Sequence, residues 1–208
     1  MLTYNRFNAF KKAFDCYLNQ TYGNIELIIV NSGDSRYQQK VEKHILSIVP
    51  TKYKITHILT EKRTIGELRN IAIDYSIGEY IIIFDDDDYH HPNRISQQME
   101  LCLKSAVQGT ILRNFIASRK ILFHTVKYYC TILKGLEGTL LFKRGCVRYP
   151  EMNQGEDTTF VNTLNKNAYS IAIIDEPYEM YTYNFYGGNT VSKKHFVEMV
   201  ENNKPLRK

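Results

Sequence analysis

The stretch Tyr80-Ile81-Ile82-Ile83-Phe84-Asp85-Asp86-Asp87-Asp88 decides how the rest of the chain is interpreted. Five consecutive apolar residues are typical of a strand buried on both faces of a sheet. Four carboxylates follow directly, and crowded like charges either raise their pKa values or take up a cation. Oxygen ligands of this kind suit Mg²⁺ or Mn²⁺. The alternative is a solvated acidic turn before a helix, because carboxylates also favour a helix N-terminus.

Short apolar runs alternate with helical periodicity on both sides of this stretch, which predicts an α/β fold with a mostly parallel sheet covered by helices on both faces. In the first half we expect strands at 27–30, 55–59 and 80–84, and helices at 7–18, 35–48 (ended by Pro50), 65–78 and from Pro92 onward. In the second half we expect strands at 138–142, 169–174 and 178–185, helices at 156–167 and 192–202, and a turn at 187–188.

Two polar segments follow buried strands and should lie on the same rim of the sheet. They are Asn31–Asp34 and Asp85–Asp88. Open α/β sheets bind ligands beyond the carboxyl ends of their strands, so this position favours the metal site over the solvated turn. His90 and His91 could add a ligand, but adjacent histidines on a turn point in different directions and are more often surface or helix-entry residues.

Charged residues elsewhere allow a functional and a structural interpretation. Glu156-Asp157 opens a predicted helix, where the pair either complements the helix dipole or supplies a base for a hydroxyl nucleophile. Lys62, Arg63 and Arg69 either meet a diphosphate or are solvated. Taken alone, these residues favour the structural interpretation in both cases.

Composition restricts the class of protein. The 208 residues are 43% hydrophobic and 24% charged, which predicts one globular domain over 1–208 and excludes a disordered chain or coiled coil. The net charge of +5 is too small to indicate a nucleic-acid partner. With no signal peptide, and no apolar run near the ~20 residues that span a bilayer, we expect a cytoplasmic protein.

The cysteines and the C-terminus carry weaker signals. No two of Cys16, Cys102, Cys130 and Cys146 form a CxxC pair, so we expect reduced thiols and no zinc site. The basic segment Lys204–Lys208 suits a peripheral contact with the cytoplasmic face of a membrane.

Read in order, several segments resemble the family 2 glycosyltransferases, which have the GT-A (Rossmann-like) fold. They are Thr3–Arg6, Asn19–Tyr22 with Ile25–Val30, Arg69-Asn70 with Gly78–Asp88, Gly138-Thr139 with Phe142-Lys143, Gly155–Asp157, and Tyr183 with Asn189. The resemblance runs from residue 3 to about 192. It implies a nucleotide-sugar-binding half over about 1–105, and an acceptor-binding and catalytic-base half over about 106–208.

The resemblance also implies an activity. It is an inverting, hexosyltransferase-type transfer from a nucleotide-diphosphate sugar, with a UDP-sugar favoured, to a glycan, lipid-linked or protein acceptor, using Mn²⁺ or Mg²⁺. Asp157 matches the family's general base, Asp87 its principal metal ligand and Asp85 a supporting ligand, while Gly138 would leave room for the sugar. The residues implied in nucleotide-sugar binding are Thr3, Tyr4, Arg6, Asn31, Arg69, Asp85 and Asp86.

This sequence departs from the family pattern at two places. Asn31 stands where the family has an aspartate that reads the base; an amide can still accept and donate hydrogen bonds, so the base preference stays open. The family also carries an apolar strand before Thr3, of which Met1-Leu2 is only the end. A truncated strand leaves backbone groups unpaired, so we expect a form extended upstream to be more stable.

Two other functions compete with transfer. One is a catalytically silent GT-A-like module that binds a nucleotide sugar or a protein. The other, a nucleotidyltransferase, is disfavoured because no Gly-rich phosphate loop lies near the start. Residues 109–137 and 146–154 fall where acceptor contacts vary, and Tyr128, Tyr129 and Tyr149 are either sugar-stacking or packing aromatics.

Overall fold

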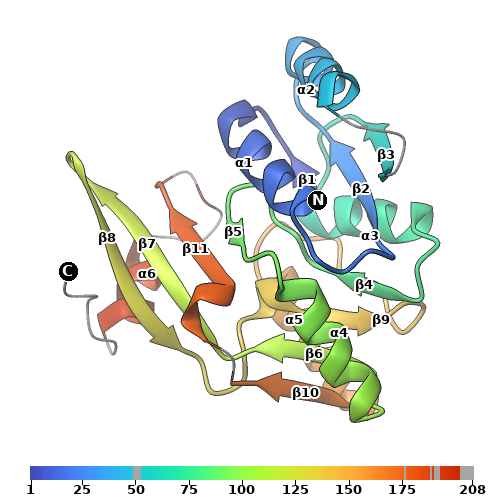
Figure 1. The fold of residues 1–208 in the computed structure, drawn as a ribbon, viewed down its shortest axis with the longest axis vertical. Coiled ribbons are helices and arrows are strands. Elements are labelled where there is room, and N and C mark those ends of the chain that lie inside the picture. Colours follow the sequence, from blue (N-terminus) through green and yellow to red (C-terminus); the bar gives the residue numbers. More distant parts are fainter. Residues whose placement is uncertain (49–52, 176, 188, 190–192, 202–208) are drawn as a thin grey trace.

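The computed structural model describes residues 1–48, 53–175, 177–187, 189 and 193–201. Strands of three sheets are packed with helices (Figure 1), and the predicted α/β class is confirmed. The predicted turn at 187–188, the end of the helix at Pro50 and the basic C-terminus include residues outside the described ranges. All four cysteines are unpaired, as predicted.

The first sheet is parallel and covered on both faces. It has the order β1 (Leu2–Thr3), β2 (Glu26–Asn31), β3 (Lys54–Leu59), and the helices of this half are α1 (Phe7–Leu18), α2 (Ser35–Ile48) and α3 (Ile65–Tyr75). Side chains alternate along β2: Leu27 and Ile29 pack with α1 and α2, whereas Ile28 and Val30 pack with Leu68 of α3. These elements were predicted to within a residue or two, except for the end of α3, since their periodicity is regular.

The other two sheets are mixed, so the expectation of a mostly parallel sheet holds only for the first. The second has the order β10 (Ile171–Ile174), β6 (Gly109–Leu112), β9 (Leu141–Lys143), β4 (Tyr80–Ile82), with β9 antiparallel to both neighbours. The third has the order β5 (Tyr89–His90), β11 (Tyr181–Phe185), β7 (Asn114–Ile121), β8 (His124–Thr131). A two-residue turn joins β7 to β8, which forces them to be antiparallel. The sequence analysis did not predict this hairpin.

The second half also corrects two predicted strands. The strand at 138–142 begins with a 3₁₀ turn, η1 (Glu137–Thr139), because the Thr139 hydroxyl donates to Leu136 O and accepts from Leu112 N. The strand at 178–185 begins likewise with η2 (Tyr178–Met180). The remaining helices are α4 (Arg94–Lys104), α5 (Glu156–Lys166) and α6 (Lys193–Glu201).

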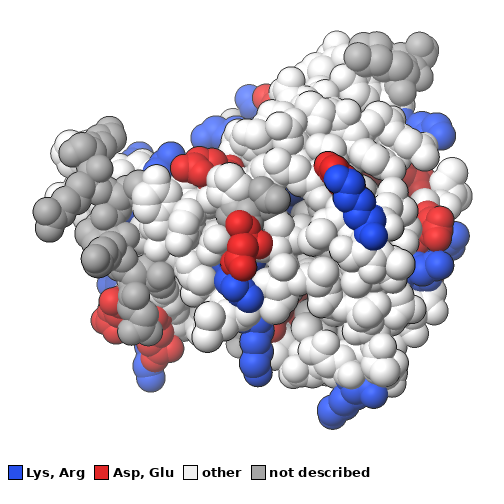
Figure 2. Space-filling model, turned by 60° about the horizontal axis from the view of Figure 1, so that its bottom comes forward, with Lys and Arg blue, Asp and Glu red and all other residues white. Residues whose placement is uncertain are grey.

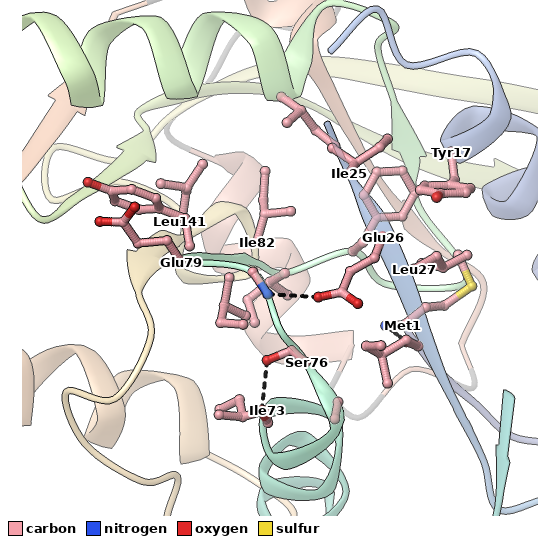
Figure 3. Close-up of a pocket in the computed structure, with 18 of the residues that line it drawn as sticks. Met1, Tyr17, Ile25, Glu26, Leu27, Ile73, Ser76, Glu79, Ile82 and Leu141 are labelled. Carbon is pink, nitrogen blue, oxygen red and sulfur yellow. Dashed lines mark hydrogen bonds between the residues drawn. The ribbon is translucent and has the colours of Figure 1, made fainter. Parts of the chain in front are cut away.

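An apolar slot lies between β2 and β4 (Figure 3). In the described structure β1 pairs only with Val30 and Asn31, so the start of β2 lacks a strand partner on that edge. β4 pairs with β9 alone. A cavity of about 480 Å³ separates the two edges, with Ile25, Leu27 and Ile82 among its lining residues. The facing edges of β2 and β4 are therefore not joined by strand pairing over this slot in the described structure.

Charged groups meet the backbone at this slot. The Glu26 carboxylate accepts hydrogen bonds from Ile77 N at 2.7 Å and Gly78 N at 2.8 Å. The Met1 ammonium donates to Ile28 O at 2.8 Å, and burial lowers its pKa to about 6. An ammonium is costly to bury, whereas a peptide N–H at the same place would continue the ladder of β1.

We expect a variant that carries a short run of Val and Ile before Met1 to unfold about 5–10 °C higher than the chain itself. Leu2 lies opposite Val30, so added residues would face Ile28, Leu27 and Glu26 in turn and pair the open edge of β2. Thermal unfolding followed by circular dichroism checks this, with an extension of equal length containing Pro and Asp as control. Equal midpoints for the apolar extension and the unextended chain would contradict it.

Candidate functional site

The four consecutive aspartates alternate between buried and partly exposed positions. Asp86 and Asp88 are 1% and 4% exposed. The side chains of Asp85 and Asp87 are 27% and 13% exposed. Asp86 and Asp87 lie in a turn that follows β4. Of the four side chains, those of Asp85 and Asp87 are the more accessible.

Asp88 holds the fold together. Its carboxylate accepts hydrogen bonds from the Tyr181 hydroxyl and from Asn184 N, at 2.8 Å for the latter, and so joins the segment just before β5 to β11. Burial raises the pKa of Asp88 well above its ordinary value. Asp88 is therefore a structural residue.

The two histidines that follow have structural contacts too. The buried His90 ring stacks on Phe84 with centroids 3.6 Å apart, and its nitrogens meet Asp85 O and the Arg94 guanidinium. His91 Nδ1 accepts a hydrogen bond from Asn93 N just before α4. His90 is therefore a buried residue of β5 that packs against Phe84, and only His91 is a helix-entry residue.

Arg6 neutralises the central aspartates. Its guanidinium forms ion pairs with Asp86 and with Asp87, in the latter case at 2.7 Å from Oδ2, and also donates to the Tyr186 hydroxyl. Burial raises the pKa of Asp86 to about 7. The Asp86 carboxylate is buried against Arg6, and its contact with a nucleotide stays a prediction.

Arg69 gathers three carboxylates from distant parts of the chain. From α3 its guanidinium lies 3.1 Å from Asp157 Oδ2, 3.5 Å from Asp85 Oδ1 and 3.5 Å from Glu156 Oε1. Below it lies the ring of Tyr149, 3% exposed and stacked on Phe160. Arg69 is itself 8% exposed, so the solvated interpretation is wrong for this residue, and Tyr149 is a packing aromatic.

Asp157 is the more accessible member of the acidic pair on α5. Its side chain is 24% exposed, against 7% for Glu156. Oδ2 accepts a hydrogen bond from Arg69, while Oδ1 is buried and has no hydrogen-bond partner in the described structure. Burial raises the pKa of Asp157 and the Arg69 charge opposes this rise. Burial raises the pKa of Glu156 to about 7.

Gly138 borders the same carboxylates. A Cβ atom built on Gly138 would lie 3.5 Å from Asp85 Oδ2 and 3.5 Å from the Tyr181 hydroxyl. The residue that the resemblance places beside the sugar is therefore next to the predicted metal ligand Asp85.

Thr3 and Asn31 lie side by side at the ends of β1 and β2. Both side chains are buried and engaged: Thr3 contacts the Tyr37 hydroxyl, while Asn31 accepts from Gly33 N at 3.1 Å and meets His57 Nε2 at 3.2 Å. Asn31 therefore shapes the turn after β2, and in this conformation its amide is not offered to a base.

Tyr4 is the exposed member of the predicted nucleoside contacts. Its side chain is 43% exposed, and Lys62 Nζ lies 5.6 Å from the centre of its ring. Arg63 instead pairs with Glu61 at 3.0 Å and with Glu67. Tyr4 and Lys62 together offer an aromatic face and a cation beside the rim.

The residues present fit a divalent cation shared with a diphosphate. Mg²⁺ commonly takes one or two protein carboxylates and completes its shell with phosphate oxygens and water. Asp85 and Asp87 supply that number, although Arg6 must release Asp87 Oδ2. Over the described residues no group of three or more His, Cys, Asp or Glu side chains could hold a metal by itself.

On the face drawn in Figure 2, Lys and Arg side chains are scattered among Asp and Glu and form no continuous basic patch. No helix in the described part of the chain is both long and apolar enough to cross a membrane.

A family model described as "Glycosyl transferase family 2" matches residues 1–148. The chain belongs to glycosyltransferase family 2. An uncharacterised glycosyltransferase of Rickettsia conorii is 35% identical over 109 residues, which are 52% of this chain and 17% of the relative. The amylovoran biosynthesis glycosyltransferase AmsB of Erwinia amylovora is 32% identical over 114 residues, 54% of this chain and 37% of AmsB. The matched part is thus well under half the length of either relative.

Solved structures of glycosyltransferases share the fold of this family 2 chain. Staphylococcus aureus TarS 1–349 in complex with UDP-GlcNAc matches with a TM-score of 0.70 and 18% identity, over 95% of this chain and 62% of TarS. The mannosyltransferase PcManGT of Pyrobaculum calidifontis, in complex with GDP-Man and Mn²⁺, matches with a TM-score of 0.66 and 16% identity, over 95% and 57%. The predicted GT-A fold is confirmed.

Proposed function

We propose that this chain transfers a sugar from a nucleoside-diphosphate sugar, with UDP as the favoured nucleotide, to an acceptor hydroxyl with inversion at the anomeric carbon. The observation that carries the proposal is the position of Arg69, whose guanidinium meets both Asp157 and Asp85. A proton acceptor therefore lies beside a carboxylate suited to a metal–diphosphate. A UDP-GlcNAc complex of TarS and a GDP-Man complex of PcManGT support a nucleotide-sugar donor.

The proposed step breaks one bond and forms one. The acceptor oxygen attacks the anomeric carbon, the bond from that carbon to the diphosphate oxygen breaks, and the nucleoside diphosphate leaves with the electron pair. The hydroxyl proton passes to the carboxylate of Asp157, the more exposed of the two acidic side chains on α5. Mn²⁺ or Mg²⁺ held by Asp85 and Asp87 would offset the charge developing on the diphosphate.

For the acceptor we propose only a chemical class. AmsB takes part in amylovoran biosynthesis according to its name, and we extend a glycan acceptor, free or lipid-linked, to this chain on that likeness. The contact surface for it is a groove of about 810 Å³ between α1 and the β7–β8 hairpin, which reaches Asp87 and is lined by Asn8, Lys120 and Asn184 among others. Amides and charged groups of this kind suit sugar hydroxyls.

A catalytically silent binding module is the second candidate. The ion pair between Arg6 and Asp87 favours this candidate, as does the hydrogen bond that the Asn31 amide accepts from Gly33. In this conformation both interactions occupy groups that the donor would have to contact. A silent module would bind the nucleotide sugar and release no free nucleotide.

Thermal unfolding with UDP, GDP or CDP, each with and without Mn²⁺, tests the donor site. Binding to the folded state stabilises by about 2.7 kcal/mol at a hundredfold excess over Kd, which raises Tm by about 5–10 °C. We expect this rise with UDP and Mn²⁺ together. If no nucleotide raises Tm, the proposed donor site is wrong. If UDP raises Tm but no UDP is released when the chain is mixed with UDP-sugars and glycan acceptors, the silent module is favoured.

Replacing Arg69 with Met is expected to move the acid limb of kcat/KM to higher pH. Burial raises the pKa of Asp157 and Arg69 opposes that rise, so losing the cation raises the pKa further. The carboxylate form accepts the proton, hence activity is lost from a higher pH as the solution is acidified. Stability falls by about 3–5 kcal/mol, because three carboxylates lose their shared cation.

The pH profile of Arg69→Lys is the matched control. Lysine keeps the charge, so its acid limb should stay near that of the unmodified chain. Coincident profiles for Arg69→Met and Arg69→Lys would show that the Arg69 charge does not govern the base.

A further inference from the structure

The turn of the β7–β8 hairpin exposes two large apolar side chains. Leu122 is 83% and Phe123 is 93% exposed, and the preceding Ile121 is 40% exposed. Figure 1 shows this tip as the far end of the hairpin, away from the first sheet. Side chains of this size at a projecting tip do not contribute to packing of the core.

The backbone at the tip is unfavourable for the residues found there. Ile121 pairs with His124, so Leu122 and Phe123 are the two central residues of the turn. Leu122 has a φ of +52°, a region where glycine or asparagine is favoured in two-residue hairpin turns. A bulky apolar residue at this position costs stability, which a function of the side chain would explain.

Cations flank the apolar tip. Arg119, Lys120 and Lys127 lie on the last residues of β7 and the first of β8, and His124 adjoins the turn. No Asp or Glu occurs anywhere in 109–136. Exposed apolar side chains surrounded by cations are suited to the surface of an anionic membrane. The acyl-chain region accommodates the apolar groups, and the anionic headgroups attract Lys and Arg.

We propose that the tip of the β7–β8 hairpin docks on an anionic lipid bilayer, with Leu122 and Phe123 among the acyl chains and Arg119, Lys120 and Lys127 at the headgroups. The groove between α1 and this hairpin extends from Lys120 and Thr125 to Asp87. Docking would therefore hold the groove near the membrane surface. A lipid-linked acceptor follows for the proposed transferase, and this last point alone rests on the proposed function.

Tryptophan fluorescence tests the docking directly, because the chain contains no tryptophan. The probe is Phe123→Trp, and the matched control is Leu46→Trp on α2, where Leu46 is 77% exposed. Vesicles of phosphatidylcholine, with or without phosphatidylglycerol, are added to each. We expect the emission of Phe123→Trp to shift to the blue on the phosphatidylglycerol vesicles and that of Leu46→Trp to stay unchanged.

Sedimentation of the variants with vesicles separates the apolar contribution to binding from the electrostatic one. Leu122→Ser with Phe123→Ser should lower the partition onto phosphatidylglycerol vesicles roughly tenfold or more. Lys120→Gln with Lys127→Gln should remove the preference for the anionic vesicles, as should high salt. Circular dichroism confirms that each variant is folded.

Three results would overturn the docking. The first is an emission of Phe123→Trp that does not shift on the vesicles, and the second is an equal shift in the emission of Leu46→Trp. The third is a dimer that forms without vesicles and is lost in Leu122→Ser with Phe123→Ser. The last would assign the tip to a second copy of the chain. None of these measurements requires sugar transfer, so they stand or fall separately from the proposed activity.

Discussion

An Asp157→Asn variant is expected to turn over about 10²- to 10⁴-fold more slowly than the unmodified chain, with little change in nucleotide affinity. The amide keeps the shape of the side chain and can still accept the hydrogen bond from Arg69 at 3.1 Å. It cannot take up the acceptor proton. The rate of nucleotide release gives kcat, and thermal unfolding with the nucleotide reports binding and folding together.

Glu156→Gln is the matched control for this variant. Glu156 precedes Asp157 in the first turn of α5 and also faces Arg69, but its side chain is 7% exposed against 24%. We expect Glu156→Gln to keep a turnover within about an order of magnitude of the unmodified chain. An equal or larger loss in Glu156→Gln, or normal turnover in Asp157→Asn, would show that Asp157 is not the base.

An Asp87→Asn variant is expected to lose the Mn²⁺-dependent part of the thermal stabilisation by UDP. Its kcat/KM should fall about 10²- to 10³-fold, which corresponds to the several kcal/mol a metal supplies to a developing charge. The physical reason is that a neutral amide is a much weaker ligand for a hard cation than a carboxylate. Titration of Mn²⁺ at fixed UDP, followed by Tm, measures the effect.

Asp88→Asn distinguishes loss of the metal site from damage to the fold. Asp88 lies one residue away, but it is 4% exposed and hydrogen-bonded to Tyr181 and Asn184. We expect Asp88→Asn to change the Tm of the protein without ligand, while the Mn²⁺-dependent rise in Tm with UDP persists. A Mn²⁺-dependent rise of normal size in Asp87→Asn would remove Asp87 from the metal site.

Local pattern was sufficient for the first half of the fold. The run Leu27–Val30 and the spacing of Phe7, Phe10 and Phe14 are set by which neighbours along the chain are apolar. The two turns after β2 and β4 followed from these strands. In the second half the hairpin at 114–131 was missed, because its turn is Leu-Phe rather than a glycine- or asparagine-rich signal.

The sequence by itself determined the α/β class, the ends of most helices and the position of the aspartates after an apolar strand, although that strand, β4, ends at Ile82 rather than Phe84 and is only partly buried. Those features depend on periodicity and propensity over a few consecutive residues. Only the tertiary structure decided that Asp86 and Asp88 turn inward, that Asn31 is engaged by Gly33 and that Arg69 joins Asp85 to Asp157. Such partners lie far apart along the chain. They are brought together by the packing of the sheets and helices, which no local pattern encodes.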